Sequence, residues 1–220
     1  MKTCTFASIF ILVLAVLLIS SCATTVLKVD SFKSVRNGDV AKVKRLIESG
    51  ADVNAQDYLG DTALMYASRD GHTEIVKLLI DTGADVNNQD FFGRTSLIWA
   101  LQKGHIDVAK LLIEAGADVN ARDEDGNTAL LNASRHGITG VVKLLIEAGA
   151  DVKEQGGTAL CLASSYGHAA IVKLLIDEGA DVNAQGHGGY TALMAASRRG
   201  YTEIAQLLIE EGADVNAKTK

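Results

Sequence analysis

The sequence lacks proline altogether and contains only three cysteines among its 220 residues. The absence of proline excludes collagen, proline-rich linkers and mucin-like stalks. Three scattered cysteines are too few for a disulfide scaffold or for a zinc site made of cysteines. Basic residues are outnumbered by acidic ones, since the formal net charge is -6, which argues against a general nucleic-acid binder. By contrast, 48% of the residues are hydrophobic and 21 are glycine, which predicts a folded core divided by frequent turns.

The first 21 residues have the pattern of an export signal rather than of a folded segment. Lys2 precedes an apolar run from Phe6 to Ile19 that only Ser8 interrupts. The run has 14 residues, whereas a membrane-spanning helix needs about 20. A basic start, a short apolar run and small residues after it predict a secretory signal peptide at residues 1–21.

The end of this segment carries a candidate lipid-attachment site. Ile19-Ser20-Ser21-Cys22 resembles the bacterial lipobox, in which the cysteine thiol is acylated and the chain is cut before it. The resemblance implies a lipid anchor on Cys22, a short linker over residues 22–30 and an exported protein of the bacterial cell envelope. Ala23 favours the outer membrane over the inner one, because an aspartate there would resemble an inner-membrane retention signal. The alternatives are an uncleaved anchor and an ordinary signal peptide cut elsewhere.

After the signal, the chain repeats itself. Gly-Ala-Asp-Val begins at intervals of 33, 33, 33, 30 and 33 residues, at Gly50, Gly83, Gly116, Gly149, Gly179 and Gly212. In the first full unit, residues 62–70 predict a helix capped by Thr62, and residues 73–81 predict a second helix ended by Gly83. Helices this short are marginal alone, so the units are expected to stack and bury a common core.

Three motifs in this period resemble the ankyrin repeat: Gly-x-Thr-Ala-Leu, Gly-His-x-Glu-Ile-Val and Gly-Ala-Asp-Val-Asn. The resemblance covers residues 31–217 and implies an all-α fold, an α-solenoid of helix-turn-helix units with hairpin-like fingers. The family's Thr-Pro-Leu-His appears here as Thr-Ala-Leu-Met, which removes a rigid helix start and a polar link between units. The expected units are an N-terminal capping repeat at 31–56, full repeats at 57–89, 90–122 and 123–155, a shortened repeat at 156–185, and a last repeat with the C-terminal tail at 186–220.

The two ends of the array differ. Lys42 and Arg45 occupy positions that are apolar in the next unit, so the first unit is expected to keep a wet outer face. The last unit keeps Ile209 and shortens only one equivalent position, to Ala205. The C-terminal end is therefore expected to be weakly capped.

The unit of 30 residues has a deletion in its finger. Lys153-Glu-Gln-Gly-Gly157 replaces the eight residues from Asn120 to Asn127. We expect a finger three residues shorter than the others, followed by a helix with Thr158 at the capping position. Two interpretations remain open: tolerated loop variation, or a notch that shapes the binding face.

No group of catalytic residues stands out. Three histidines recur at the repeat period and are expected to be structural: His72, His105 and His168. His136 and His187 have no second metal ligand at a suitable spacing. Cys161 fills a position that is apolar in the other units, which predicts a core residue rather than a nucleophile. The sequence thus predicts no enzyme, no cofactor and no metal.

Positions that vary between repeats carry the functional signal, because packing holds the others constant. The resemblance implies that the variable positions line a concave face, made of finger tips and first helices, where a partner protein binds. The candidate partner-binding residues on the finger tips are Tyr58, Leu59, Asp61, Phe91, Phe92, Arg94, Glu124, Asp125, Asn127 and Tyr190. Those on the first helices are Tyr66, Arg69, Asp70, Trp99, Gln102, Lys103, Asn132, Arg135, His136, Tyr166, Arg198 and Arg199.

Aromatic residues crowd into two adjacent repeats, at Tyr58, Tyr66, Phe91, Phe92 and Trp99. Exposed aromatic side chains on one face are typical of an interface hot spot. The alternative is burial: Tyr66 and Trp99 would fill gaps between first helices, and the two phenylalanines would pack into the fingers.

Charged residues also separate along the repeats. Basic residues recur on the first helices, at Arg69, Lys103, Arg135, Arg198 and Arg199. Acidic residues recur on the fingers, at Asp57, Asp61, Asp90 and residues 123–125. This arrangement suits a partner of mixed charge, or else it is a solvated face with local salt bridges.

Taken together, these features predict an exported, non-catalytic module that binds another protein through its concave face. The N-terminal lipid would hold it on a membrane, and nucleic acid is not an expected partner. The alternative is a self-associating structural protein of the cell envelope, which the weakly capped end suggests.

Substitution of Cys22 tests the lipid anchor. Cys22→Ala removes the only proposed acyl acceptor, so it should abolish acyl labelling and release the domain from membranes. A diacylated cysteine supplies two chains, enough for stable anchoring where one is marginal. A variant that is still labelled and still sediments with membranes would show that the lipobox assignment is wrong.

Overall fold

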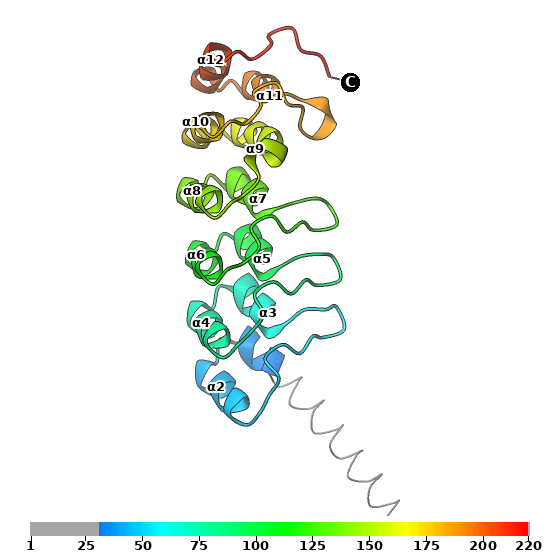
Figure 1. The fold of residues 1–220 in the computed structure, drawn as a ribbon, viewed down its shortest axis with the longest axis vertical. Coiled ribbons are helices and arrows are strands. Elements are labelled where there is room, and N and C mark those ends of the chain that lie inside the picture. Colours follow the sequence, from blue (N-terminus) through cyan, green and yellow to red (C-terminus); the bar gives the residue numbers. More distant parts are fainter. Residues whose placement is uncertain (1–30, 220) are drawn as a thin grey trace, which may run out of the picture.

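The computed structural model describes residues 31–219. The predicted signal peptide, Cys22 and the linker over residues 22–30 lie outside the described residues. Figure 1 shows the described part as a single column of helix pairs stacked along one axis, with loops projecting from one side. Within residues 31–219, every helix is too short or too polar to cross a bilayer.

Six helix pairs make up the column, in chain order. Helical residues 31–36 pair with α2 (Val40–Glu48), α3 (Ala63–Asp70) with α4 (Thr73–Asp81), α5 (Ser96–Lys103) with α6 (Ile106–Glu114), α7 (Ala129–His136) with α8 (Thr139–Glu147), α9 (Val152–Tyr166) with α10 (Ala169–Asp177), and α11 (Ala192–Arg199) with α12 (Thr202–Glu210). A short 3₁₀ turn, η1 (His187–Gly189), precedes α11. The all-α solenoid predicted from the sequence is confirmed, and the described fingers hold only one isolated β-bridge, between Gln56 and Thr62.

The first helices begin and end where the sequence predicts. The Thr62 side chain accepts a hydrogen bond from the amide of Met65 at 3.3 Å, which caps α3. Gly71 ends the helix with a φ of 77°, a left-handed conformation that favours glycine. The same threonine cap and glycine stop bound α5, α7 and α11.

A continuous core runs through the column. Leucines of successive units, such as Leu64, Leu97 and Leu130 on the first helices, are completely buried. Leu112 and Leu145 on the second helices are equally buried. Helices of eight or nine residues gain little stability from their own hydrogen bonds, so contact between neighbouring units holds the array together.

Asparagine side chains tie each unit to the next. The Oδ1 of Asn54 accepts a hydrogen bond from the amide of Asp85 at 2.8 Å, and its Nδ2 donates to the carbonyl of Gly83 at 3.2 Å. The same two bonds recur from Asn87, Asn120 and Asn183. Each side chain satisfies two backbone groups of the following turn and so fixes the spacing between units.

Histidines make a second link between units. The Nε2 of His72 lies 3.2 Å from the carbonyl oxygen of Arg36, and His105 and His168 contact the carbonyls of Arg69 and Arg135 in the same way. These three bonds confirm that the recurring histidines are structural.

The shortened unit differs from the sequence prediction. Residues 153–157 do not form a shorter finger, because α9 runs without a break from Val152 to Tyr166. Asp151 caps this long helix by accepting a hydrogen bond from the amide of Glu154 at 2.9 Å. Thr158 therefore lies inside α9 rather than at its start, and the helix crosses the predicted repeat boundary between residues 155 and 156.

Two glycines allow α9 to pack closely on the next turn. A Cβ at Gly156 would lie 2.8 Å from the Cβ of Ala180, and one at Gly157 would overlap the Cβ of Ala184. This unit has Lys153 where the other units have the linking asparagine, so it lacks the two hydrogen bonds to the following turn. The close contact of Gly156 and Gly157 with that turn joins the two units instead.

The ends of the column differ as expected. At the N-terminal end Arg45 is exposed and Lys42 half-buried. At the C-terminal end Ile209 is 50% exposed, whereas its equivalents Ile113 and Ile146 are partly buried and pack on the core. Leu208, by contrast, is fully buried within its own unit, so the open end exposes less apolar surface than the sequence suggested.

Leucine truncation measures how much each position depends on its neighbours. Leu145→Ala should lower the free energy of unfolding by about 2–5 kcal/mol, because it leaves a cavity between units on both sides. Ile209→Ala should cost clearly less, since half of that side chain already faces solvent. Denaturant titration compares the two, and equal losses would mean that the C-terminal end is covered.

Substitution of Gly157 tests the close packing of α9. Gly157→Ala should destabilise the fold by about 1–3 kcal/mol through overpacking, even though alanine favours helix. The matched control is Gly140→Ala in α8, where an added Cβ meets no atom within 4 Å. That control should stabilise the protein by about 0.4–1 kcal/mol. Thermal and urea unfolding measure both variants. If Gly157→Ala stabilised the protein as Gly140→Ala does, Gly157 would not pack closely on Ala184.

Candidate partner-binding surface

One side of the column presents the fingers and the first helices. We call this surface the finger face, and define it by finger residues 57–61, 90–94, 123–127 and 186–190 with helices α3, α5, α7, α9 and α11. Figure 1 shows the fingers projecting on the side away from α4, α6, α8, α10 and α12.

An aspartate shapes each of the first three fingers. The Oδ1 of Asp90 accepts hydrogen bonds from the amides of Phe92 and Arg94, both at 2.9 Å. Asp57 and Asp123 make the same pair of bonds in their own fingers. A glycine with positive φ closes the turn, as Gly93 does at 73°. Three of the acidic residues that recur on the fingers, Asp57, Asp90 and Asp123, therefore stabilise turns. Two of them, Asp90 and Asp123, are buried.

Adjacent fingers are joined through their backbones. The amide of Phe91 donates to the carbonyl of Leu59 at 3.0 Å, and the amide of Glu124 donates to the carbonyl of Phe92 at 2.9 Å. These bonds make the first three fingers a connected shelf on which the variable side chains stand.

Three aromatic side chains on the tips of the first three fingers face solvent. Tyr58 is 83% exposed, Phe91 67% and Phe92 44%. The exposure predicted for the two phenylalanines is confirmed. Arg94 lies over the Phe92 ring at 4.6 Å, which partly orders that side chain.

Tyr66 and Trp99 are buried, so the prediction that they are exposed is wrong. The hydroxyl of Tyr66 donates to Asp57 at 2.6 Å, and Arg69 lies over the ring at 4.5 Å. Burial and this hydrogen bond raise the pKa of Tyr66. Arg94 lies 4.0 Å and Arg69 5.4 Å from the centre of the Trp99 ring. The two aromatic rings thus fill the gaps between first helices, which was the alternative interpretation.

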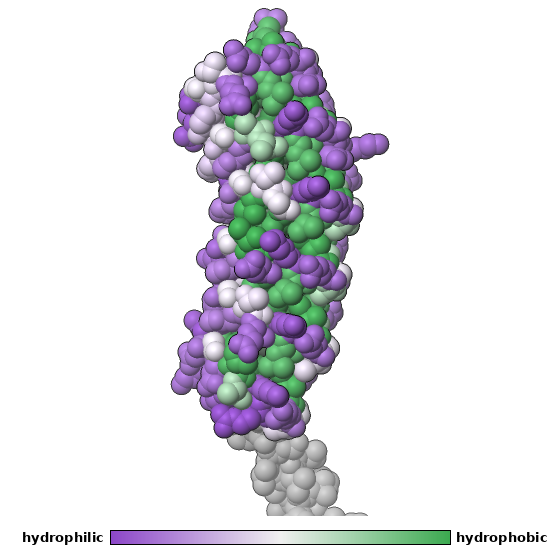
Figure 2. Space-filling view, turned by 90° about the vertical axis from the view of Figure 1, so that its left-hand side faces the viewer, coloured by the Kyte–Doolittle hydropathy of each residue, from purple (hydrophilic) through white to green (hydrophobic). Residues whose placement is uncertain are grey.

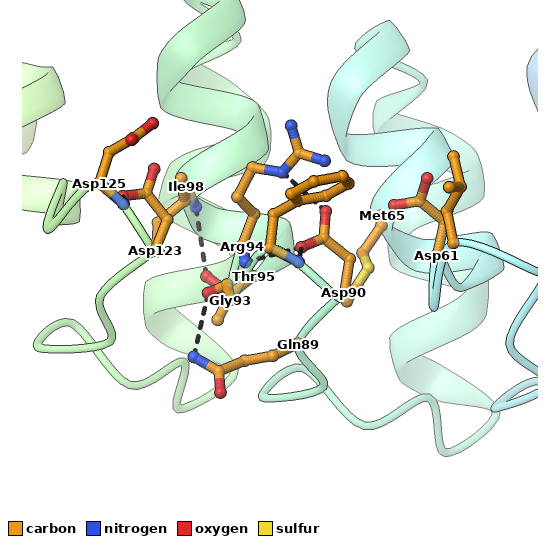
Figure 3. A network of polar contacts seen from close by, with 12 residues as sticks. Asp61, Met65, Gln89, Asp90, Gly93, Arg94, Thr95, Ile98, Asp123 and Asp125 are labelled. Carbon is orange, nitrogen blue, oxygen red and sulfur yellow. Dashed lines mark hydrogen bonds and ion pairs between the residues drawn. The ribbon is translucent and has the colours of Figure 1, made fainter.

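Asp61 is another predicted surface residue that the fold buries, with 3% of its surface exposed. Its Oδ1 has no hydrogen-bond partner among the described residues. Burial raises the pKa of this carboxyl, and the nearby charges of Asp57 and Asp90 raise it further. Figure 3 shows Asp61 on the finger next to the one where Arg94 pairs with Asp90 at 2.7 Å.

The remaining predicted residues divide by exposure. The exposed ones are Asp70, Lys103, Glu124, Asp125, His136, Tyr166, Tyr190, Arg198 and Arg199. The partly exposed ones are Leu59, Arg69, Arg94, Gln102, Asn127 and Arg135. Asn132 is buried and donates to the carbonyl of Thr128 at 3.0 Å. Like Asp61, Tyr66 and Trp99, it is therefore part of the packed array and not available to a partner.

The opposite face has a different character. Figure 2 shows the side formed by the second helices as a broken band of hydrophobic residues between hydrophilic ones. Its leucines, such as Leu78 and Leu111, are partly buried and pack on the core. Large aromatic side chains with high exposure instead gather on the finger tips, at Tyr58, Phe91 and Phe92.

The described residues bear on two of the groups considered in the sequence, a metal site and the Cys161 thiol. Among the described residues, no three His, Cys, Asp or Glu side chains lie close enough together to hold a metal ion. Cys161 is buried, as predicted, and its thiol donates to the carbonyl of Tyr190 at 3.2 Å. Burial raises the pKa of this thiol, which disfavours the reactive thiolate.

The geometry defines the class: a solenoid of stacked helix pairs with a row of fingers. An ankyrin-repeat family profile (three copies) matches residues 32–123, 120–186 and 155–219. The chain belongs to the ankyrin-repeat family, whose domains generally serve as protein–protein interaction modules.

Solved structures agree with this assignment. The human ASB11 ankyrin repeat domain is 27% identical, with a TM-score of 0.74 and coverage of 86% of each chain. An ankyrin repeat domain from Acinetobacter baumannii AYE is 33% identical, with a TM-score of 0.74 and coverage of 84% of this chain and 98% of that one. No curated protein matches the sequence.

The pH dependence of stability tests the burial of Asp61. A raised pKa means that the folded protein holds this proton more tightly than the unfolded chain does. The stability gained from protonated Asp61 is complete below the ordinary value of 3.8 and is lost as pH rises through the folded pKa. Asp61→Asn should therefore gain stability relative to the wild type as the pH rises above the ordinary value of 3.8 in urea titrations. If the difference in unfolding free energy between the two proteins did not change with pH, folding would not raise the pKa of Asp61.

Proposed function

We propose that this protein is a membrane-tethered, non-catalytic module that binds a partner protein through its finger face. The observation that carries the proposal is the exposure of Tyr58, Phe91 and Phe92 on a shelf of hydrogen-bonded fingers. Large aromatic side chains left in water on a rigid support are typical of binding hot spots, because they bury much area with little loss of conformational freedom.

The tether follows from the sequence before the array. Lipidation of Cys22 would leave the nine residues 22–30 between the lipid and the first described helix. A linker of that length spans at most about 30 Å, so the finger face would work close to the membrane surface. The proposed location is the bacterial cell envelope, with the outer membrane favoured.

Self-association is the second candidate. Ile209 is 50% exposed and Val215 65% exposed at the C-terminal end of the described column. Light scattering at increasing protein concentration distinguishes the two proposals. A monomer at all concentrations supports a binding module, and a growing oligomer that Ile209→Glu dissociates supports self-association.

Substitution of the finger phenylalanines tests the binding face. Phe91→Ala and Phe92→Ala should each weaken partner binding by more than about 1 kcal/mol, as hot-spot residues do, with little effect on unfolding. The matched control is Ile106→Ala, which removes an apolar side chain of 39% exposure from the second helix of the same unit. Crosslinked pull-downs from the native envelope, quantified by mass spectrometry, compare the three variants.

Two results would overturn this assignment. If either phenylalanine change destabilised the fold by several kcal/mol, the side chain would be core and not interface. If Ile106→Ala lost the partner while both phenylalanine variants kept it, binding would lie on the second helices.

A further inference from the structure

The helix that replaces the fourth finger opens a gap in the finger face. Fingers cover the start of α3, α5, α7 and α11, and their capping threonines are buried at 0–3% exposure. Thr158, the equivalent residue in α9, is partly exposed because it lies within an uninterrupted helix. Figure 1 shows α9 without a projecting loop between the finger before α7 and η1.

A pocket of about 180 Å³ lies beside this gap, between α9 and α11. Leu162 and Cys161 of α9 and Ala195 of α11, all buried or partly buried, form its apolar floor. The polar residues of its lining are Thr158, Ser165, Tyr190, Arg198 and Arg199. Pockets for drug-sized ligands measure about 300–1,000 Å³, so this one suits a single side chain of a partner rather than a free metabolite.

A small residue keeps the pocket open. Ala195 occupies the position that Trp99 fills on α5, where the large ring is buried beside Arg69 and Arg94. The combination of a missing finger and a small side chain at this position occurs only between α9 and α11.

The charge at the pocket is positive and uncompensated. Arg69 pairs with Asp70 at 3.3 Å and Arg94 pairs with Asp90 at 2.7 Å. Arg198 and Arg199 are exposed and have no acidic partner among the described residues. The residues that line the pocket include no aspartate or glutamate. Two unpaired arginines in a chain of net charge -6 form a local site for an anion.

We propose that this pocket takes one apolar side chain of the partner protein, while the carboxylate of a neighbouring acidic residue of the partner pairs with Arg198 and Arg199 beside it. The arginines supply charge-assisted hydrogen bonds to the carboxylate, and Leu162 and Ala195 contact the apolar residue. This inference rests on the proposed function and names one element of what the finger face recognises.

The test uses defined probes and the full chain in detergent micelles. The protein carries ¹³C-methyl labels on alanine and leucine, so Ala195 and Leu162 report from inside the pocket by NMR. The probes are three capped dipeptides: N-acetyl-Leu-Glu-amide with a side-chain carboxylate, N-acetyl-Leu-Gln-amide with none, and N-acetyl-Leu-Gln with a terminal carboxylate.

The Glu probe should shift the Ala195 and Leu162 methyl signals in a saturable way, and salt should weaken the effect. The Gln amide should bind about tenfold more weakly or worse, because it lacks the charge. Arg198→Glu with Arg199→Glu should abolish the response. Ala195→Trp, a residue that the same position holds in α5, should block it sterically, with Leu162 as the remaining reporter.

The matched control is Lys173→Glu, which reverses an exposed positive charge on α10, outside the finger face but in the same unit as α9, and should leave the response unchanged. Equal binding of the Glu and Gln amides, preference for the terminal carboxylate, or a response that survives both pocket variants would each overturn the proposal. Failure here leaves the pull-down result with Phe91 and Phe92 standing, since those residues lie three units away. Loss of the pull-down with retained dipeptide binding would instead reject the proposed function alone.

Discussion

Every unit of this protein depends on its neighbours, because a pair of helices eight or nine residues long cannot bury its own apolar face. The buried leucines of adjacent units form one core, and the asparagine and histidine bonds set the distance at which those units meet. The rigidity of the fingers follows from the same constraint. Their backbones are spaced by the stack, so the aromatic side chains at their tips keep a fixed arrangement.

The fourth unit shows how far the pattern can be broken while the stack survives. It lacks the aspartate turn and the asparagine link, and it replaces both with a longer helix whose two glycines pack closely on the following turn. Gln155 adds polar contacts to the preceding part of the array, since its side chain accepts a hydrogen bond from Thr128 at 2.6 Å and donates to Asn120 at 3.2 Å. The longer helix replaces the fourth finger, and a pocket lies beside it on the finger face.

The fold followed from the sequence because its motifs recur at a fixed period, and helix caps such as Thr62 and Gly71 act locally. Side-chain burial did not follow as well. Tyr66 and Trp99 vary between repeats as surface residues do, yet they fill gaps whose size only the packed helices reveal. One signal was present but missed: aspartate is followed three residues later by glycine at Asp57, Asp90 and Asp123, and the fourth unit has no such pair. That spacing predicts an aspartate-closed turn in three fingers and its loss in the fourth.

The central claim is that partners meet this protein on its finger face. A photocrosslinking scan tests it most directly, with benzoylphenylalanine placed singly at Phe91 and Tyr166 on the finger face and at Lys77 and Lys143 on exposed positions of the second helices. The account predicts that a crosslinked partner forms from the first two positions and not from the second two. A partner captured from Lys77 and Lys143 but not from Phe91 and Tyr166 would contradict it.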